Sequence, residues 1–153
     1  MKIFFKYNII RKQEVKVQMI DKQIVFEELL KLKNNSYSPY SNFKVACLIN
    51  LKNGKVVKGV NVENASYPAG ICGERTALSQ VYTLGYKKED IEFLSLYTDS
   101  EDMGSPCGVC RQVISELVDW ETPIFIYSKK GFQIEMNIKE LLPYAFEPKQ
   151  LIK

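Results

Sequence analysis

The residues best suited to chemistry in this chain are its cysteines. Cys107 and Cys110 are separated by two residues in the stretch SPCGVC, and Cys72 lies earlier in the chain, in ICGER. A pair with this spacing usually binds a metal or forms a disulfide. The chain has 153 residues and no histidine, so any zinc site must rely on thiolates. We therefore asked which residues complete the site.

Two predicted helices bring three of these cysteines together. Cys107 and Cys110 are three residues apart in the first turn of one predicted helix, so their sulfurs share one face. Cys72 begins another predicted helix. Three thiolates leave one of the four positions of a zinc ion for water, which is the catalytic pattern, whereas structural zinc sites are closed by four protein ligands. The sequence predicts a catalytic Zn²⁺ site formed by Cys72, Cys107 and Cys110.

Two other uses of the cysteines remain open. A closed zinc clip would need Cys47 as the fourth ligand, but Cys47 lies in VACLI, a predicted buried strand where a free cysteine usually serves as a small apolar residue. A redox pair would leave Cys72 and Glu74 without a role. In a cytosolic protein the cysteines stay reduced, which favours a metal over disulfides.

Glu74 follows Cys72 by two residues and could move protons. A glutamate in the first turn of a helix often does no more than complement the helix dipole. Beside a zinc ion that activates water, a carboxylate can act as general acid and base. Three thiolates also need positive charge nearby, which two helix N-termini supply in part. Arg75 is predicted to donate hydrogen bonds to the sulfurs; the alternative is a surface salt bridge.

The elements that must position these residues follow from periodicity and turn signals. Residues 20–35 predict a helix capped by Asp21, with one apolar face made by Ile24, Val25, Leu29, Leu30 and Leu32. Asn53-Gly54 predicts a hairpin. The predicted strands are 43–50, 55–62, 91–98, 122–128 and 132–138, and the further helices are 71–85, 107–118 and 138–146. This order predicts an α/β sandwich in which helices cover a mixed sheet.

Composition excludes several classes of protein. A formal charge of +3, spread along the chain, is too small for a nucleic-acid-binding surface. No apolar stretch is long enough to span a bilayer, so no membrane partner is expected. Lys6, Arg11 and Lys12 interrupt the apolar start, which argues against a secretory signal and for a cytoplasmic protein. Residues 1–18 are expected to be an N-terminal extension that can be disordered, and residues 19–153 a single domain.

Five ordered motifs carry a family resemblance. SPYSNFKV, GVNVENASY, ICGERTAL, SPCGVCRQV and ELLPYAF resemble the homotetrameric zinc-dependent cytidine deaminases of the cytidine/deoxycytidylate deaminase superfamily, from about Ile20 to Phe146. The resemblance implies a three-layer α/β/α sandwich with a five-stranded mixed sheet. It implies that the three cysteines bind zinc and that Glu74 is the proton shuttle.

The resemblance also implies a substrate pocket. Phe43 would pack on the pyrimidine, Asn61 and Glu63 would hold the ribose hydroxyls, and the backbone near Gly73 would contact the base. Phe146 would reach into the pocket of a neighbouring subunit of a homotetramer. From the residues alone, Phe43 and Phe146 could instead be core residues, and Asn61 a turn former.

The implied reaction is hydrolytic deamination of cytidine and deoxycytidine to uridine and deoxyuridine plus ammonia, in pyrimidine salvage. One alternative is another small-molecule deaminase of the same fold, such as a blasticidin S deaminase. A polynucleotide deaminase would need a basic channel and stacking platforms. A non-enzymatic zinc-binding module would need four protein ligands. The chain departs from the usual pattern at Gly73, Cys47 and Tyr144, which bears on substrate preference and subunit contacts.

Overall fold

The computed structural model describes residues 20–152, so the predicted extension 1–18 lies outside the described residues. Its strands and main helices, in chain order, are α1 Lys22–Leu32, β1 Val45–Leu51, β2 Val56–Val60, α2 Gly73–Thr83, β3 Ile91–Thr98, α3 Gly108–Leu117, β4 Ile124–Ser128, β5 Gly131–Met136 and α4 Ile138–Leu141. The predicted order of helices and strands is confirmed. Within these residues, no helix is both long and apolar enough to cross a membrane.

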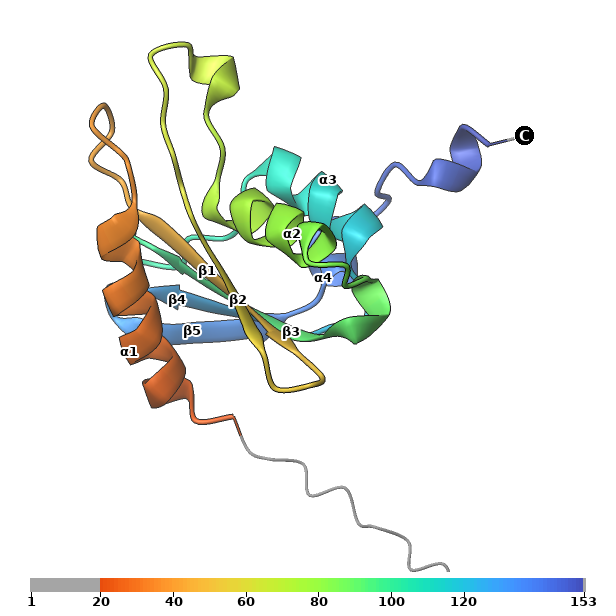
Figure 1. Cartoon of the computed structure of the whole chain (residues 1–153), viewed down its shortest axis with the longest axis horizontal. Helices are drawn as coiled ribbons and strands as arrows, with labels where there is room; N and C mark the ends of the chain where they lie inside the picture. Colours follow the sequence, from red (N-terminus) through yellow and green to blue (C-terminus); the bar gives the residue numbers. More distant parts are fainter. Residues whose placement is uncertain (1–19, 153) are drawn as a thin grey trace, which may run out of the picture.

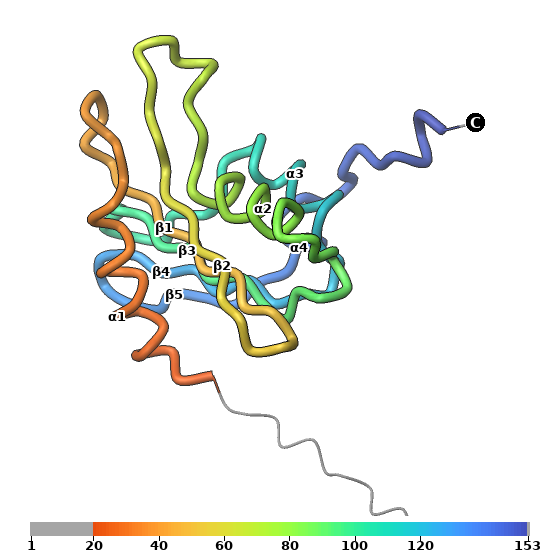
Figure 2. Tube along the Cα trace, in the orientation of Figure 1, coloured from red at the N-terminus to blue at the C-terminus, as the bar shows by residue number. Residues whose placement is uncertain are grey.

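The five strands form one mixed sheet in the order β2-β1-β3-β4-β5. The β3–β4 pair is parallel and the other pairs are antiparallel. Helix α1 covers one face of the sheet, and α2, α3 and α4 cover the other (Figures 1 and 2). The predicted three-layer α/β/α sandwich with a five-stranded mixed sheet is confirmed.

Strand β3 runs through the middle of the sheet and is buried on both faces. Its side chains alternate between two apolar cores because successive residues of a strand point to opposite faces. Leu94 and Leu96 join the core under α2 and α3, whereas Phe93 and Tyr97 join the core under α1. The residues after its last position, Thr98, therefore emerge from a rigid scaffold at one end of the sheet.

Helix α1 begins at the predicted cap. The Asp21 carboxylate accepts hydrogen bonds from the backbone N–H groups of Gln23 (2.9 Å) and Ile24 (3.2 Å), which would otherwise lack partners at the helix start. Leu29 is fully buried. The prediction that Ile24 belongs to the apolar face is wrong, since its side chain is 59% exposed. At 3.6 residues per turn, Ile24 lies roughly 140° around the helix from Leu29.

Helix α2 lies unusually close to β2, and Gly59 makes this possible. A Cβ atom at Gly59 would lie 2.3 Å from the Gly73 carbonyl oxygen and 2.4 Å from the Ala77 nitrogen. Any other residue would push the helix away from the sheet and displace its N-terminus. The helix is followed, as predicted, by Gly85 with a positive φ of 84°.

Candidate active site

Three thiols meet where two helices begin. Cys72 is the N-cap of α2 and Cys107 is the N-cap of α3, while Cys110 lies in the first turn of α3 and is buried. The three sulfur atoms lie within 4.8 Å of one another, and the Cys72 and Cys107 sulfurs are 3.9 Å apart. Both helices thus direct the positive ends of their dipoles at one cluster of sulfurs.

The cluster fits a zinc ion. Zinc–sulfur bonds of about 2.3 Å in a tetrahedral arrangement place two sulfurs about 3.8 Å apart, close to the observed 3.9 Å. Cys47 lies in the apolar core on β1, fully buried, and is not part of the cluster. Among the described residues, which include all four cysteines of the chain, the group therefore offers three sulfur ligands and one open position.

The charge balance of the thiols points the same way. The pKa of Cys72 is lowered to about 5, mainly by a hydrogen bond from Cys110. Burial acts in the opposite direction and raises this pKa, whereas Arg75 lowers it further. The same contact with Cys72 raises the pKa of Cys110, because a second thiolate next to the first is repelled. A cation among the sulfurs removes this conflict, since it stabilises each thiolate.

Arg75 lies beside the cluster and also bonds to the backbone of the loop that precedes α2. Its Nη2 atom donates to the carbonyl oxygen of Gly70 at 3.2 Å. Its Nε atom is buried without a hydrogen-bond partner among the described residues. After the contact with Cys110, hydrogen bonding by Arg75 and the positive charge of Arg75 also help to lower the pKa of Cys72. Arg75 therefore stabilises the Cys72 thiolate in both ways.

Glu74 is a buried carboxyl group with one free oxygen. Its side chain lies at the start of α2, the residue is 3% exposed, and Oε2 has no hydrogen-bond partner among the described residues. Burial raises the pKa of Glu74 to about 7. A carboxyl group with a pKa near neutrality can both accept and return a proton, which suits a general acid and base.

A cavity of about 580 Å³ opens in front of the thiols and Glu74. It brings together side chains from the loop before β1, the loop between β2 and α2, and the loop between β3 and α3. Among the predicted site residues, the cavity is lined by Phe43, Asn61, Glu63, Cys72, Glu74, Arg75 and Cys107. Its size and mixture of apolar and polar walls suit a small organic ligand.

The remaining predicted residues do not line this cavity. Cys110 and Gly73 are buried behind it, and a Cβ at Gly73 would lie 3.2 Å from Val45 Cγ1, so this glycine lets α2 pack closely on β1. Phe146 is 53% exposed and lies in the segment after α4, which extends away from the sheet (Figure 1). Tyr144, one of the departures from the family pattern, is fully exposed with a positive φ of 60°.

Asn61 is committed to the backbone of the neighbouring segment. Its Oδ1 accepts hydrogen bonds from the N–H of Val45 (2.8 Å) and from the Ser36 hydroxyl, and its Nδ2 donates to the carbonyl oxygen of Phe43 (2.8 Å). An asparagine side chain has two acceptor sites on oxygen and two N–H donors. One N–H of Asn61 is therefore left for a ligand.

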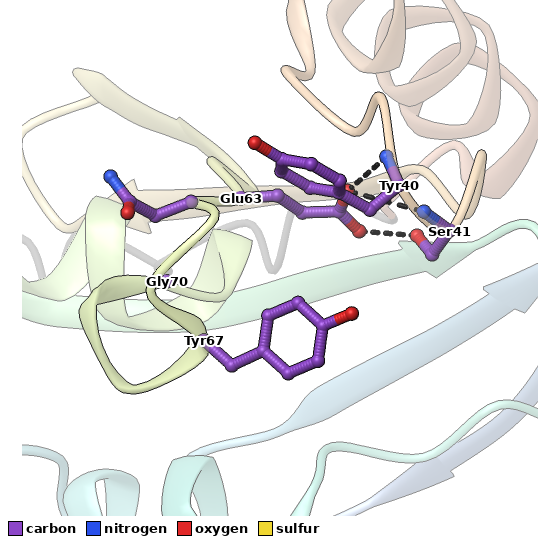
Figure 3. A pocket seen from close by; sticks show the side chains of 6 residues that line it. Tyr40, Ser41, Glu63, Tyr67 and Gly70 are labelled. Atoms are coloured by element: carbon purple, nitrogen blue, oxygen red, sulfur yellow. Dashed lines mark hydrogen bonds between the residues drawn. The ribbon is translucent and has the colours of Figure 1, made fainter.

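Glu63 is oriented by the loop that precedes β1. Its carboxylate accepts hydrogen bonds from the backbone N–H groups of Tyr40 (2.9 Å) and Ser41 (3.2 Å) and from the Ser41 hydroxyl, as Figure 3 shows. The Ser41 hydroxyl is the main reason why the pKa of Glu63 lies below its usual value. The carboxylate is thus held ionised, with acceptor capacity left for a ligand hydroxyl.

An adjoining hollow of about 330 Å³ shares Ser41, Glu63 and Tyr67 with the cavity. The rings of Tyr40 and Tyr67 approach edge to face, with centroids 6.5 Å apart, on either side of the Glu63 carboxylate (Figure 3). Ser41 and Tyr67 also line the cavity and were not among the predicted site residues, although they lie in the motifs SPYSNFKV and GVNVENASY. Two further lining residues were not predicted: Thr98, which ends a predicted strand, and Ser105, which begins the motif SPCGVCRQV.

Comparison with known proteins identifies the family. Residues 19–125 match the family described as the cytidine and deoxycytidylate deaminase zinc-binding region. This match covers well over half of the chain and includes the three clustered cysteines and Glu74. The chain belongs to the cytidine and deoxycytidylate deaminase family. The region that matches this zinc-binding family thus contains the thiol cluster, whose sulfur spacing fits a zinc ion.

Individual relatives agree with this assignment. The chain is 37% identical over 127 residues to the cytidine deaminase of Halalkalibacterium halodurans, a match that covers 83% of this chain and 95% of the relative. It is 36% identical over 123 residues to the cytidine deaminase of Mycoplasma genitalium, covering 80% and 93%. The crystal structure of cytidine deaminase from Burkholderia pseudomallei superposes with a TM-score of 0.77 at 35% identity, covering 81% of this chain and 98% of that one.

Proposed function

We propose that this protein is a zinc-dependent cytidine deaminase. It would hydrolyse the exocyclic amino group of cytidine and deoxycytidine, giving uridine or deoxyuridine and ammonia, as a step of pyrimidine salvage. The observation that carries the proposal is the Glu74 carboxyl group, buried with one unpaired oxygen, in the wall of the cavity that the sulfurs of Cys72 and Cys107 also line. The family membership supports the same reaction.

The residues of the chain divide the chemistry between them. Held by Cys72, Cys107 and Cys110, zinc would supply a Lewis acid that activates water near neutral pH. Glu74 accepts a proton from the attacking water and delivers it to N3 of the pyrimidine. It later carries the second proton of that water to the departing amino group, which leaves as ammonia. Its pKa of about 7 suits both directions of transfer. Arg75 and the two helix N-termini offset the charge of the thiolates.

The cavity walls would select a neutral nucleoside. The Phe43 side chain is 41% exposed, so a face of its ring is available for the pyrimidine. The free N–H of Asn61 and the Glu63 carboxylate would hold the ribose hydroxyls. The backbone at Gly73, at the start of α2, would contact the base. The negative charge of the Glu63 carboxylate would also repel the phosphate of a nucleotide.

The proposal includes a homotetramer in which Phe146 closes the cavity of a neighbouring subunit. Three observations support it: Phe146 is 53% exposed, Tyr144 is fully exposed, and Gln112 Nε2 holds the Phe146 carbonyl oxygen at 2.8 Å. Mixing Glu74→Gln chains with Phe146→Ala chains should then restore some activity, because a mixed assembly contains pockets with both groups intact. No restoration on mixing, together with a monomeric active enzyme in sedimentation, would refute the shared pocket.

We also propose a cytoplasmic location, because three free thiols can bind zinc only in a compartment that keeps them reduced.

The reaction is tested by incubating the purified protein with cytidine and following ammonia release and the loss of cytidine absorbance. Glu74→Gln keeps the shape of the side chain and removes the base, so turnover should fall by at least ~10²–10⁴-fold. Zinc content, measured by metal analysis, should stay unchanged. Glu116→Gln, at an exposed position on α3, is the matched control. Near-normal turnover by Glu74→Gln would show that another group moves the protons.

The alternatives predict different results in the same assay. A deaminase of the blasticidin S type would turn over blasticidin S far faster than cytidine. A non-enzymatic zinc-binding module would keep its zinc and release no ammonia from either compound.

A further inference from the structure

A polar cluster lies at the end of the sheet beside the cavity, between α1 and the loop after β3. Lys33, which caps the C-terminus of α1, donates hydrogen bonds from Nζ to Asp99 Oδ1 and to the Tyr97 hydroxyl oxygen, each at 2.8 Å. The Tyr97 hydroxyl in turn donates to Asp99 Oδ1 at 2.8 Å. The side chains of Lys33 and Asp99 are only 22% and 15% exposed, so solvent screens this pair weakly.

The other carboxylate oxygen and the backbone N–H of Asp99 both bond to one residue, Lys44, in the loop that precedes β1. Its Oδ2 accepts a hydrogen bond from the backbone N–H of Lys44 (3.2 Å), and its own N–H donates to the Lys44 carbonyl oxygen (3.0 Å). Lys44 is the residue between Phe43 and Val45. Asp99 therefore connects the end of α1 to the backbone immediately after the aromatic residue of the cavity.

The segment from Phe43 to Val45 is gripped from a second direction by Asn61. Asn61 holds the Phe43 carbonyl oxygen and the Val45 N–H, and the Ser41 hydroxyl accepts from the Phe43 N–H (3.0 Å). Phe43 is 41% exposed, so neighbouring residues cover it only in part. The position of the ring over the cavity therefore depends on these backbone hydrogen bonds.

We propose that Asp99, oriented by Lys33 and Tyr97, is a positioning residue that fixes Phe43 for stacking on the pyrimidine of the substrate. This inference rests on the proposed function. Asp99 does not line the cavity and acts only through the Lys44 backbone. Substitution of Asp99 should therefore weaken binding of the nucleoside, whereas proton transfer by Glu74 should be unaffected.

The same loop supplies a matched control. Asp102 pairs with Lys130 at 2.9 Å, but their side chains are 88% and 61% exposed. Exposed pairs of this kind contribute about 0–1 kcal/mol. The side chain of Asp102 bonds to Lys130 and not to the Phe43 segment. Asp102→Asn removes the same negative charge as Asp99→Asn, at a position three residues further along the chain. It does not alter any hydrogen bond to the backbone around Phe43.

The experiment measures kcat and KM for cytidine in the zinc-loaded enzyme. Asp99→Asn and Lys33→Met should raise KM roughly ten- to a hundredfold, since a small misplacement of a contacting group can cost this much. The value of kcat should stay within about threefold, as expected when a variant loses binding shared by ground and transition states. Lys33→Arg, which keeps the cation, should recover part of the KM. Asp102→Asn should match the wild type in both constants.

Other outcomes overturn the inference in distinguishable ways. A normal KM in folded Asp99→Asn, or a fall in active fraction and melting temperature with KM unchanged, would show a purely structural role. If Asp99→Asn does not fold, Lys33→Met and Tyr97→Phe decide the question by the same criterion. If the wild type itself does not deaminate cytidine, the proposed function fails and the inference fails with it.

Discussion

Asn61→Ala is expected to destabilise the protein and to weaken nucleoside binding together. The substitution removes the hydrogen bonds to the Val45 N–H, the Phe43 carbonyl oxygen and the Ser36 hydroxyl. A buried polar group left without a partner costs about 1–3 kcal/mol. Because Phe43 is more exposed than Val45, we expect the Val45 N–H to bear most of this penalty. We therefore expect the free energy of unfolding to fall by roughly 2–4 kcal/mol.

The stability assay is denaturant unfolding of the zinc-loaded protein, followed by circular dichroism. Asn64→Ala is the matched control, because Asn64 is exposed and holds only the Ser66 N–H, at 2.8 Å. It should change the free energy of unfolding by no more than about 0.5 kcal/mol. Asn61→Asp adds a second comparison. It keeps the shape and the bond to Val45 but places an oxygen against the Phe43 carbonyl oxygen, so it too should destabilise.

The kinetic assay separates scaffold from ligand contact. Because Asn61 positions Phe43 and also offers one N–H to the ribose, Asn61→Ala should raise KM for cytidine. A variant as stable as the wild type but with a raised KM would refute the scaffold role. A destabilised variant with a normal KM would refute both the ligand contact and the dependence of Phe43 on this side chain.

Three further results are expected. Replacing any one of the three clustered cysteines with alanine should empty the zinc site in metal analysis, while Cys47→Ala should retain the metal; loss of zinc from Cys47→Ala alone would contradict the open site. Burial alone would raise the pKa of Asp99, but hydrogen bonds from Lys33 and Tyr97 outweigh it and lower the pKa below its usual value. The stability that depends on ionised Asp99 is therefore present above its unfolded pKa of about 3.9 and is lost as pH falls through the folded pKa. The difference in unfolding free energy between wild type and Asp99→Asn should shrink from pH 7 to pH 3, and a difference that does not depend on pH would contradict the assignment. Glu63→Ala should impair cytidine turnover without loss of zinc, and free cytosine should be a far poorer substrate than cytidine. Equal rates on cytosine and cytidine would remove the sugar contact.

Local signals in the sequence were enough for the secondary structure. Asn53-Gly54 marked the hairpin, Asp21 the start of α1 and Gly85 the end of α2, and each is found where it was predicted. These signals act through the residue's own backbone preferences or through neighbours a few positions away, so they can be recognised without the fold. Ile24 was misplaced because the apolar residues of α1 span more of the helix circumference than the sheet covers.

The thiol cluster was predictable for a related reason. Cys107 and Cys110 share a helical turn, and Cys72 begins a second helix, so their spacing and chemistry indicated a common metal. The sequence thus determined which residue types were available and that helices cover a mixed sheet, and its resemblance to a known family implied the three-layer architecture and the class of reaction. The buried carboxyl group of Glu74 could be named, but its raised pKa could not, because that depends on how deeply the packed helices bury it.

Only the tertiary structure decided how the cavity is held together. Asn61 meets partners at positions 36, 43 and 45, and Asp99 meets Lys33 and Lys44, which precede it by 66 and 55 residues. Arg75 also donates to the Gly70 carbonyl oxygen, five residues before it. Each of these hydrogen bonds requires its donor–acceptor distance to be correct to within a few tenths of an ångström. The segments that carry the donors and acceptors are brought together only by the order of strands in the sheet. Composition and spacing carry no information at that scale.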